Sequence, residues 1–486
     1  MAERESRAEL AQAGPLILLA VWAGLVSGLV EGPVWMLIQR FDRLTNLWTH
    51  VIWIAPVLNG LVFLAAGSLL ALGARLLPDR WRGTVPPFLV ATAFATLFAA
   101  QVFNRYVHAA VLPILVLGIA TALTRLIRRD EAATLRLVRR TLPLLASAAV
   151  ALLIGIEGYY ALRERSETRA LPSAEAGVPD VVVVVIDALR ADHVSAYGYH
   201  RPTSPFIDRM AKAGVLFERT LSPSPYSLPS HASLLSGLYP DEHEVEWLQF
   251  NVFRDAAYPS IAEAMRDLGY RTGAFSSNPF WFTREQGFGR GFLRFEDFYH
   301  SLADMAYRTV LGKIVERIQP RLGFEQIPAR KEATEGVDRV LDWVGQEGDH
   351  PVFAFINLFD VHDPYIPPQP WRSQFSELEA PGGILNWRLG RGELELTAEE
   401  RLSEIEAYDG ALAYVDTEIE RLYETLRSRR PGRELLLIVT SDHGEAFDEH
   451  GGYLHARSLY REELLIPLIM VGPGVPPDTR INRPVS

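Results

Sequence analysis

The stretch that decides the fold runs from Val181 to Asp192 and reads VVVVVIDALRAD. An apolar run of this length, rich in β-branched side chains, is typical of a parallel-type strand that is covered on both faces. Asp187 follows the run directly, and in such sheets ligands bind at the carboxyl ends of the strands. The sequence therefore places Asp187 at a candidate site, with a helix N-cap or a turn aspartate as the alternative.

A second segment of the same design lies far downstream, from Glu434 to Gly444, and reads ELLLIVTSDHG. It is again a short apolar strand that ends in a carboxylate, Asp442, with His443 beside it. Because the carboxyl ends of neighbouring parallel strands meet at one edge of a sheet, the two strand ends can share one metal ion.

From Val178 onward, apolar strand runs alternate with helical segments. The helical segments are Pro205–Ala213, Pro259–Leu268, Lys331–Gly345 and Glu404–Arg427. In the last of them, apolar residues at 412, 415, 419 and 422 recur at helical spacing, so one face packs on a sheet. This alternation predicts an α/β domain over residues 179–486.

The first third of the chain, residues 1–163, is predicted to be an all-α domain of five transmembrane helices. Five mostly apolar segments are each near the ~20 residues needed to span a bilayer. They are Pro15–Ile38, Val51–Leu77, Pro86–Phe103, Val107–Ile127 and Leu142–Leu162. The acidic residues within them, Glu31 and Glu157, are expected at the membrane interface, which disfavours a transporter. Residues 164–178 are polar and small and are predicted to form a linker.

Arginine sets the expected orientation of this membrane domain. The connection between the fourth and fifth spans contains the most arginine. The connection between the second and third spans contains more arginine than either of the alternate loops. Positively charged loops stay in the cytoplasm. With five spans, the chain is predicted to be an integral multi-pass membrane protein whose domain after Arg163 is extracytoplasmic.

Composition excludes two kinds of site. The chain has no cysteine, so it has no disulfides and no thiolate metal ligands. Its net charge of -11 argues against nucleic acid as a partner, because binding to a phosphate backbone requires a basic face.

A third segment, Pro225 to Gly237 (PYSLPSHASLLSG), carries the candidate nucleophile. Pro229 and the apolar helical run after it place Ser227 near the amino terminus of a helix. Free backbone N–H groups and the positive end of the helix dipole favour an alkoxide there, or the phosphoryl or sulfuryl oxygens of a substrate. The alternative is that Ser227 or Ser230 only caps the helix.

Together these segments resemble the sulfatase branch of the alkaline phosphatase superfamily, from about Val178 to the end of the chain. The elements that carry the resemblance are Asp187, Ser227-Leu228-Pro229-Ser230 with Leu234, Leu235 and Gly237, Gly269-Tyr270-Arg271-Thr272, His362-Asp363-Pro364-Tyr365, Tyr408-Asp409 with Asp416, and Ser441-Asp442-His443-Gly444. The resemblance implies an alkaline-phosphatase-like mixed β-sheet flanked by helices. It also implies a divalent cation held by carboxylates, a histidine or asparagine, and the nucleophile.

Carried onto this chain, the resemblance makes Asp187, Asp442 and His443 metal ligands and Ser227 the nucleophile, with its oxygen on the metal. Coordination lowers the pKa of a hydroxyl that otherwise attacks poorly, and the same cation neutralises charge on the ester oxygens. Oxygen ligands with one imidazole suit Ca, Mg, Mn or Zn, and ligand type alone does not choose among them.

Three further histidines are candidate catalytic residues by the same resemblance. His362 resembles the family's active-site histidine, which donates a proton to the leaving oxygen or binds a non-bridging one. His455 stands where sulfatases carry a lysine and phosphoethanolamine transferases a zinc-binding histidine, and His231 stands where sulfatases place an arginine. The alternative for each is an ordinary surface histidine. Asp360 could orient His362, join a second metal or be a surface carboxylate.

The chain departs from the family around its nucleophile. A conventional sulfatase oxidises a cysteine or serine in a Cys/Ser-x-Pro-x-Arg context to formylglycine, whereas here the arginine is His231. The sulfate-binding lysine is also absent, because Ser276-Ser277-Asn278-Pro279 replaces the usual Gly-Lys-Trp-His element. Unmodified Ser227 is therefore the preferred nucleophile.

The preferred hypothesis is a membrane-anchored, metal-dependent enzyme that hydrolyses or transfers a phosphate or sulfate ester group. Its expected partners are the lipid bilayer and an ester substrate such as an envelope lipid or glycan. The alternatives are a true sulfatase in which Ser227 becomes formylglycine, and a noncatalytic sulfatase-like domain that binds an envelope polymer. Residues 463–471 (ELLIPLIMV) read as a further buried strand. Because family members continue beyond this point, we expect the catalytic domain to be truncated at its C-terminus.

Overall fold

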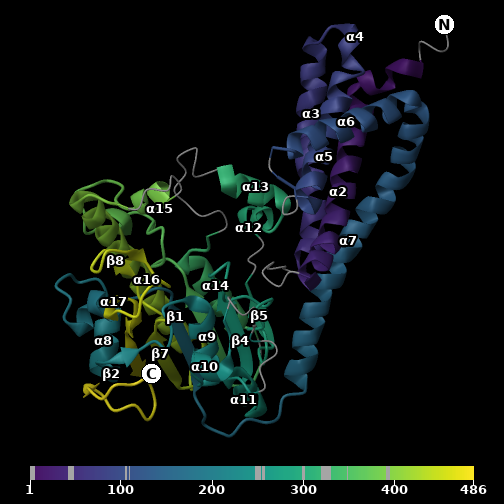
Figure 1. Ribbon diagram of the computed structural model, residues 1–486. Coiled ribbons are helices and arrows are strands. Elements are labelled where there is room, and N and C mark those ends of the chain that lie inside the picture. The colour runs from purple at the N-terminus through teal and green to yellow at the C-terminus, as the bar shows by residue number, and fades with distance from the viewer. Residues whose placement is uncertain are drawn as a thin grey trace. The chain divides into compact units, whose positions relative to one another are not determined.

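The computed structural model describes residues 6–41, 49–103, 107–108, 110–246, 253, 258–297, 301–318, 330–346, 348–389 and 395–486. Over these residues the chain forms two compact units (Figure 1). The helical unit comprises residues 1–162 and 300–317, and the α/β unit comprises residues 163–299 and 318–486.

The long helices of the helical unit overlap the five apolar segments that the sequence predicts. The helices of this unit are η1 (Ser6–Ala11), α2 (Ala13–Phe41), α3 (Val51–Gly73), η2 (Ala74–Leu76), α4 (Asp79–Arg82), α5 (Val85–Val102), α6 (Leu112–Arg129), α7 (Glu131–Arg169), α12 (Leu302–Tyr307) and α13 (Val310–Ile318). Within the described residues, four segments are long and apolar enough to cross a membrane: Ala13–Leu37, Val51–Leu76, Asp79–Val102 and Glu131–Arg169. The fourth predicted span, α6, is not among them, because its 18 residues carry arginine at 125, 128 and 129.

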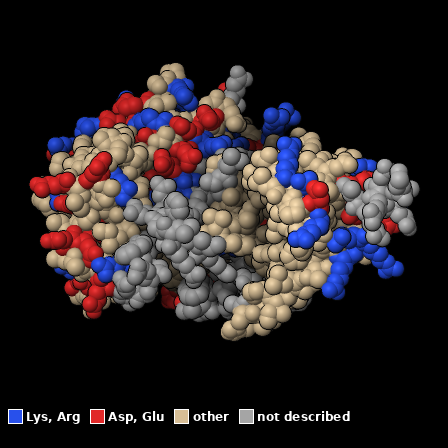
Figure 2. All heavy atoms as spheres, turned by 90° about the horizontal axis from the view of Figure 1, so that it is seen from above, with Lys and Arg blue, Asp and Glu red and all other residues tan. Residues whose placement is uncertain are grey.

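The surface of the helical unit is largely uncharged. Large apolar side chains stand exposed on its helices, for example Leu69 on α3 and Ile154 on α7. Figure 2 shows broad uncharged areas on this unit, whereas acidic and basic side chains intermingle over the α/β unit. Exposed apolar surface of this extent fits contact with lipid.

α7 is a single 39-residue helix that runs into the predicted linker. Residues 164–169 are helical because they are good helix formers, with no proline before Pro172. Near the end of α7, Glu164 accepts hydrogen bonds from Trp343 Nε1 at 2.8 Å and Arg294 Nη1 at 3.2 Å. Glu164 belongs to the α/β unit, so these bonds lie within that unit.

Glu31 lies buried within the helical unit and not at the membrane interface. Its Oε2 accepts hydrogen bonds from Asn59 at 3.2 Å and Gln101 at 3.1 Å, and its Oε1 accepts one from the backbone N–H of Val310 at 2.7 Å. Val310 and Ile314 of α13 pack into the apolar cluster of the same unit. The chain therefore returns to the helical unit after β5, which the sequence analysis did not predict.

In the described part of the α/β unit, eight strands form a mixed sheet in the order β12-β2-β11-β7-β1-β6-β4-β5. The strands are β1 (Asp180–Ile186), β2 (Val215–Phe217), β3 (Thr220–Leu221), β4 (Arg271–Ser276), β5 (Arg294–Glu296), β6 (Val352–Leu358), β7 (Leu435–Thr440), β8 (Ala446–Phe447), β9 (Tyr453–Leu454), β10 (Leu465–Ile466), β11 (Leu468–Val471) and β12 (Thr479–Ile481). β1 lies between β6 and β7 and is parallel to both, whereas β11 runs antiparallel to β7. The valine run thus occupies the middle of the sheet, as expected.

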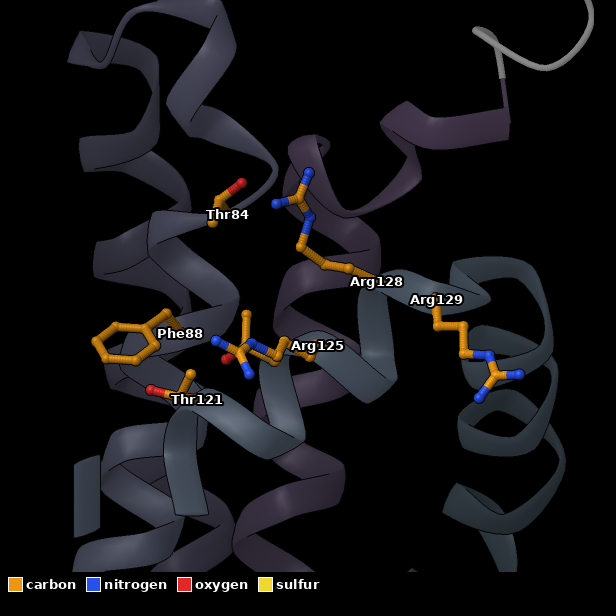
Figure 3. A pocket seen from close by; sticks show the side chains of 7 residues that line it. Thr84, Phe88, Thr121, Arg125, Arg128 and Arg129 are labelled. Atoms are coloured by element: carbon orange, nitrogen blue, oxygen red, sulfur yellow. The ribbon is translucent and has the colours of Figure 1, made fainter. Parts of the chain in front are cut away.

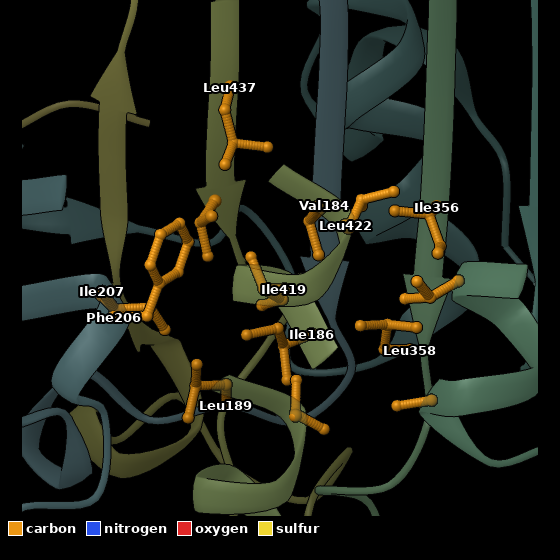
Figure 4. Close-up of a cluster of buried hydrophobic side chains, with 14 of the residues drawn as sticks. Val184, Ile186, Leu189, Phe206, Ile207, Ile356, Leu358, Ile419, Leu422 and Leu437 are labelled. Atoms are coloured by element: carbon orange, nitrogen blue, oxygen red, sulfur yellow. The ribbon is translucent and has the colours of Figure 1, made fainter. Parts of the chain in front are cut away.

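Helices cover both faces of this sheet. They are α8 (Pro205–Ala213), α9 (Ser227–Ser236), α10 (Pro240–His243), α11 (Ile261–Asp267), α14 (Ala333–Val344), α15 (Ile384–Leu389), α16 (Ala398–Arg429) and α17 (Arg461–Leu464), with the 3-10 turns η3 (Ala191–His193), η4 (Ser195–Tyr197) and η7 (Trp371–Ser373). Val184 of β1 packs with Ile419 of α16 on one face (Figure 4). Val185 packs with Leu228 of α9 on the other face. Neighbouring residues of a strand point to opposite faces, so one run supplies both cores. The predicted α/β class, a mixed β-sheet flanked by helices, is confirmed.

One predicted strand is wrong in detail. Residues 463–471 do not form one strand, because Glu463 and Leu464 end helix α17 and Pro467 separates β10 from β11. Proline has no N–H to donate to a ladder. β10 accordingly pairs with β3, and β11 joins the main sheet beside β7.

Candidate active site

The two strand ends that the sequence singles out meet in space. Asp187 follows β1, and Asp442 and His443 follow β7, which is its parallel neighbour. Each of the three buried residues offers one ligand atom, and these atoms lie within 4.8 Å of one another. Two carboxylates and an imidazole at this spacing are a suitable ligand set for a divalent cation.

Ser227 faces this cluster. It is the first residue of α9, after the N-cap residue Tyr226, and no side chain caps the helix. Its Oγ lies 3.4 Å from Asp187 Oδ1 and 3.2 Å from His443 Nε2. The Ser230 hydroxyl instead donates to the carbonyl of Ser224 at 2.9 Å. Neither serine caps the helix, and Ser227 is the one turned toward the carboxylates.

Asp442 has one oxygen in use and one without a partner. Its Oδ1 accepts hydrogen bonds from the backbone N–H groups of Ala188 at 3.2 Å and His443 at 2.9 Å. Its Oδ2 is buried, and no donor from the described residues reaches it. Burial alone would raise the pKa of Asp442, but the imidazoles of His443 and His231 outweigh burial and lower it. A buried carboxylate oxygen without a donor fits a bound cation.

The tautomer of His443 also fits a bound cation. Its Nδ1 donates to the carbonyl of Gly444 at 2.8 Å, so the lone pair is on Nε2. That nitrogen is 3.4 Å from Asp442 Oδ2 and 3.7 Å from Asp187 Oδ1. A backbone bond that fixes a ring in this way is the usual support of a metal-binding histidine.

Two amide side chains that the sequence analysis did not assign hold Asp187. Asn278 and Asn357 donate to its Oδ2 at 2.9 and 3.0 Å, and Asn278 also lies 3.4 Å from Ser227 Oγ. Burial, followed by the charge of Asp442, raises the pKa of Asp187. Asn278 follows β4 and Asn357 is near the end of β6, so the strand-end argument that found Asp187 also points to both.

His455 and His362 extend the site beyond His443. The ring centroids of His443 and His455 are 4.3 Å apart, and those of His455 and His362 are 4.8 Å apart. His455 Nδ1 bonds Glu445 Oε1 at 2.8 Å. Burial lowers the pKa of His455, but the Glu445 carboxylate outweighs it and raises the pKa to about 9. Burial and then His455 lower the pKa of His362 well below its ordinary value.

The backbone around His455 is strained. Leu454 and Ala456, on either side of it, have φ values of 70° and 65°, and the N–H of Ala456 donates to the carbonyl of Pro225 at 3.0 Å. A left-handed conformation costs a residue with a side chain about 1–3 kcal/mol and persists only where its surroundings enforce it. The strain therefore marks His455 as a residue that the fold holds in place.

His231 lies behind the nucleophile. Its Nδ1 donates to the carbonyl of Ser227 at 2.8 Å, its Nε2 is 3.3 Å from the amide nitrogen of Asn357, and its ring stacks on Phe282. Both ring nitrogens are thus engaged by the protein. Asp360 is buried too, which raises its pKa to about 7.

Comparison with known proteins now decides the family. The model of the Sulfatase family matches residues 179–486. The chain belongs to the sulfatase family.

Individual relatives of this sulfatase-family chain are distant. Arylsulfatase K of Canis lupus familiaris is 24% identical over 345 residues, which cover 64% of this chain and 61% of that protein. Among solved structures, the chain resembles phosphonate monoester hydrolase of Agrobacterium radiobacter, with 21% identity, a TM-score of 0.47, and coverage of 63% of this chain and 71% of the other. It also resembles the soluble domain of lipooligosaccharide phosphoethanolamine transferase A of Neisseria meningitidis, with 17% identity, a TM-score of 0.45, and coverage of 62% and 79%.

The chain spans about three fifths of the length of the curated sulfatases it matches, 61% for the canine protein. The predicted family resemblance is confirmed.

Proposed function

We propose that this protein is a membrane-anchored, metal-dependent enzyme that hydrolyses or transfers a phosphate or sulfate ester group through unmodified Ser227. One observation carries the proposal. The hydroxyl of Ser227 lies 3.4 Å from Asp187 and 3.2 Å from His443, beside an oxygen of Asp442 that no described donor reaches. A serine hydroxyl whose partners all belong to this cluster, next to an unsatisfied carboxylate oxygen, is placed for chemistry.

The cation would be held by Asp187, Asp442, His443 and Ser227. When bound, it would lower the pKa of the hydroxyl and offset negative charge on the ester oxygens. The ligand set suits Ca, Mg, Mn or Zn.

The protein's own groups supply the remaining steps. Ser227 gives its proton to water, and its Oγ forms a bond to the phosphorus or sulfur atom while the bond to the leaving oxygen breaks. Water or an acceptor alcohol then attacks the same atom and releases Ser227. Because Ser227 opens α9, the backbone N–H groups of the first turn favour the negative charge of the transferred group.

His455 is the proposed proton donor to the leaving oxygen, held by Glu445 at 2.8 Å. His362, stacked on Phe359 with a ring-centroid distance of 4.1 Å, is the proposed contact for a non-bridging oxygen. Substrates with good and poor leaving groups separate the two roles. His455→Gln should slow turnover of an alkyl ester far more than that of a nitrophenyl ester, whereas His362→Gln should slow both alike. Equal effects of His455→Gln on both esters would remove it from the donor role.

A substrate panel combined with metal analysis tests the whole proposal. The full chain is purified in detergent, its metal content is measured, and phosphomonoesters, phosphodiesters and sulfate esters are assayed before and after chelation. We expect bound metal and turnover that chelation abolishes and one metal restores. Absence of both would favour the noncatalytic alternative, a domain that only binds an envelope polymer.

The second candidate is a true sulfatase in which Ser227 is converted to formylglycine. The Ser-Leu-Pro element favours it, and His231 in place of the arginine opposes it. Oxidation of serine to the aldehyde removes about 2 Da. We expect the peptide that contains Ser227 to have the unmodified mass, and a loss of two hydrogens would replace our proposal with this one.

The proposed location is a multi-pass membrane protein with an extracytoplasmic catalytic domain and an envelope lipid or glycan as substrate. The arginines in the last turns of α6 and the first turns of α7 support this orientation. Because the chain has no cysteine, single introduced thiols report without background. Ser173→Cys, an exposed position after α7, should react with an impermeant maleimide on intact cells, and Asp130→Cys, between α6 and α7, should not. The reverse labelling would overturn the orientation.

A further inference from the structure

We propose that a pocket between α5 and α6 binds the phosphate head group of an anionic phospholipid. The pocket has a volume of about 430 Å³ and shares no residue with the catalytic site. Its walls are Thr84, Phe88, Thr121, Thr124, Arg125, Arg128 and Arg129. All belong to the helical unit. The inference goes beyond the proposed function and does not depend on it.

The guanidinium groups of this pocket have N–H donors that can bind a ligand. In the described parts of the chain, Arg125 and Arg128 form no hydrogen bond or ion pair. Arg82, at the neighbouring helix end, differs because it pairs with Asp79 at 2.7 Å and donates to backbone carbonyls. Two guanidinium groups without partners at one pocket suit the charge and the fork geometry of a phosphate.

The side chains converge on the pocket. Figure 3 shows Arg125 and Arg128 extending from α6 toward Thr84 and Phe88, whereas Arg129 turns toward α7. Thr84 precedes α5, and its hydroxyl makes no capping bond. Two guanidinium groups and a free hydroxyl therefore face the same space.

The nearest acidic residues are fewer than the arginines of the pocket. The Asp130 carboxylate accepts a hydrogen bond from the N–H of Ala133 at 2.8 Å at the start of α7. Glu131 is buried and interacts electrostatically with Arg128, so two carboxylates stand beside Arg125, Arg128 and Arg129. The pocket thus keeps a net positive charge.

The face of α6 that leads to the pocket has the polarity order of a phospholipid. Ile114 and Leu117 are 71% and 52% exposed, and Thr121, Arg125 and Arg128 follow at helical spacings of three and four residues. At about 1.5 Å per residue, Ile114 lies ~10 Å from Thr121, and Thr121 lies ~10 Å from Arg128. Along this face, the apolar side chains match the acyl chains of a phospholipid, the hydroxyl groups match its glycerol, and the guanidinium groups match its phosphate.

A simpler account of these arginines is that they only hold the loop in the cytoplasm. That account explains their charge but not their convergence on α5. Arg136 and Arg140 of α7 provide the distinction, because they are exposed, carry the same charge along the same connection, and do not line the pocket. They form the matched control pair.

Native mass spectrometry of the full chain tests the proposal. Wild type, Arg125→Gln/Arg128→Gln and Arg136→Gln/Arg140→Gln are titrated in mild detergent with phosphatidylglycerol and with phosphatidylcholine. We expect the pocket pair to weaken phosphatidylglycerol binding about thirtyfold, at roughly 1 kcal/mol per arginine, and the control pair to change it less than about twofold. Phosphatidylcholine should bind all three proteins weakly and alike. An equal loss in both pairs, or equal binding of the two lipids, would overturn the site.

Two further arms separate lipid from free phosphate and folding from binding. Millimolar inorganic phosphate should not displace phosphatidylglycerol, and displacement would make the pocket a site for soluble phosphate, contrary to the proposal. Thr84→Val, which keeps the charge, should weaken phosphatidylglycerol binding with an unchanged unfolding temperature, and no change in binding would count against the site. Turnover of a soluble ester should be the same in all variants, so a failure of the lipid site and a failure of the proposed function are distinguishable.

Discussion

Buried carboxylates occur in both units of this molecule, but their surroundings differ. In the helical unit, Glu31 receives donors on both oxygens, from Asn59, Gln101 and the backbone of Val310. In the α/β unit, Oδ2 of Asp442 lies buried with no donor from the described residues. A carboxylate that is fully matched fixes structure, whereas one left unmatched beside a second carboxylate is ready for a ligand.

The largest expected effect belongs to the unmatched side. Ser227→Ala removes the oxygen that forms the new bond, so turnover should fall about 10³-fold or more while the metal content stays near that of wild type. Initial rates on the best ester of the panel measure this. Ser236→Ala, whose hydroxyl bonds the carbonyl of Ala232 on the same helix, should keep its rate. A Ser227→Ala enzyme with a tenth of the activity would break the assignment of the nucleophile.

A pair of aspartates tests the comparison within one unit. Asp409 is fully matched, since it accepts from His193 at 2.7 Å and from Tyr199 and Arg201 at 2.8 Å each. Asp409→Asn leaves buried donors mispaired and should lower the free energy of unfolding by about 3–5 kcal/mol. Asp442→Asn should lose the bound cation without destabilising the chelated protein. Thermal unfolding after chelation measures both, and equal losses would erase the distinction.

Glu31→Gln addresses the matched carboxylate of the helical unit. An amide offers one acceptor where two are used, so the substitution should cost about 1–3 kcal/mol. It should also expose the chain around α13 to protease before global unfolding. Glu9→Gln, a partly exposed carboxylate 3.5 Å from Arg139, is the control and should change little. An unfolding temperature equal to wild type would show that α13 does not depend on Glu31.

Asp363 provides the most specific effect, a change in how stability depends on pH. Burial, then the charges of Glu404 and Glu445, raise its pKa from an ordinary 3.8 to about 8. Between these values the folded protein holds a proton that the unfolded chain has lost, so the stability contributed by Asp363 falls as pH rises from about 4 to about 8. Asp363→Asn should flatten that slope and gain stability relative to wild type at pH 8. Unfolding temperatures across this range measure it. Exposed Asp342→Asn should keep the wild-type slope, and an unchanged slope in Asp363→Asn would contradict the raised pKa.

Much of the α/β unit follows from local pattern. The helix Pro205–Ala213 has the predicted bounds, because its apolar spacing and the proline at its first position act within a few residues. Asp187, Asp442, His443 and Ser227 come together because parallel strands bring their carboxyl ends to one edge. That rule needs only the order of residues along each strand.

The rest depends on contacts between distant segments. Asn357 reaches Asp187 because Val185 pairs with Asn357 across β1 and β6, a register that no single segment encodes. Likewise, the apolar side of α13 shows that the helix must be covered but not that Glu31 lies beneath Val310. The residue types show which side chains can form hydrogen bonds or bind a ligand. Contacts between distant segments determine which of those side chains have partners in the protein.

The bond between Glu31 and Val310 bears on how this protein can be dissected. The polypeptide of the α/β unit is continuous with the helical unit at α7 and again at α12 and α13. A single proteolytic nick after Arg169 should therefore leave the two fragments associated. A recombinant fragment that begins at the linker lacks the helices against which Val310 and Ile314 pack, so these apolar side chains would be exposed. Such a fragment should self-associate unless residues 302–318 are deleted as well.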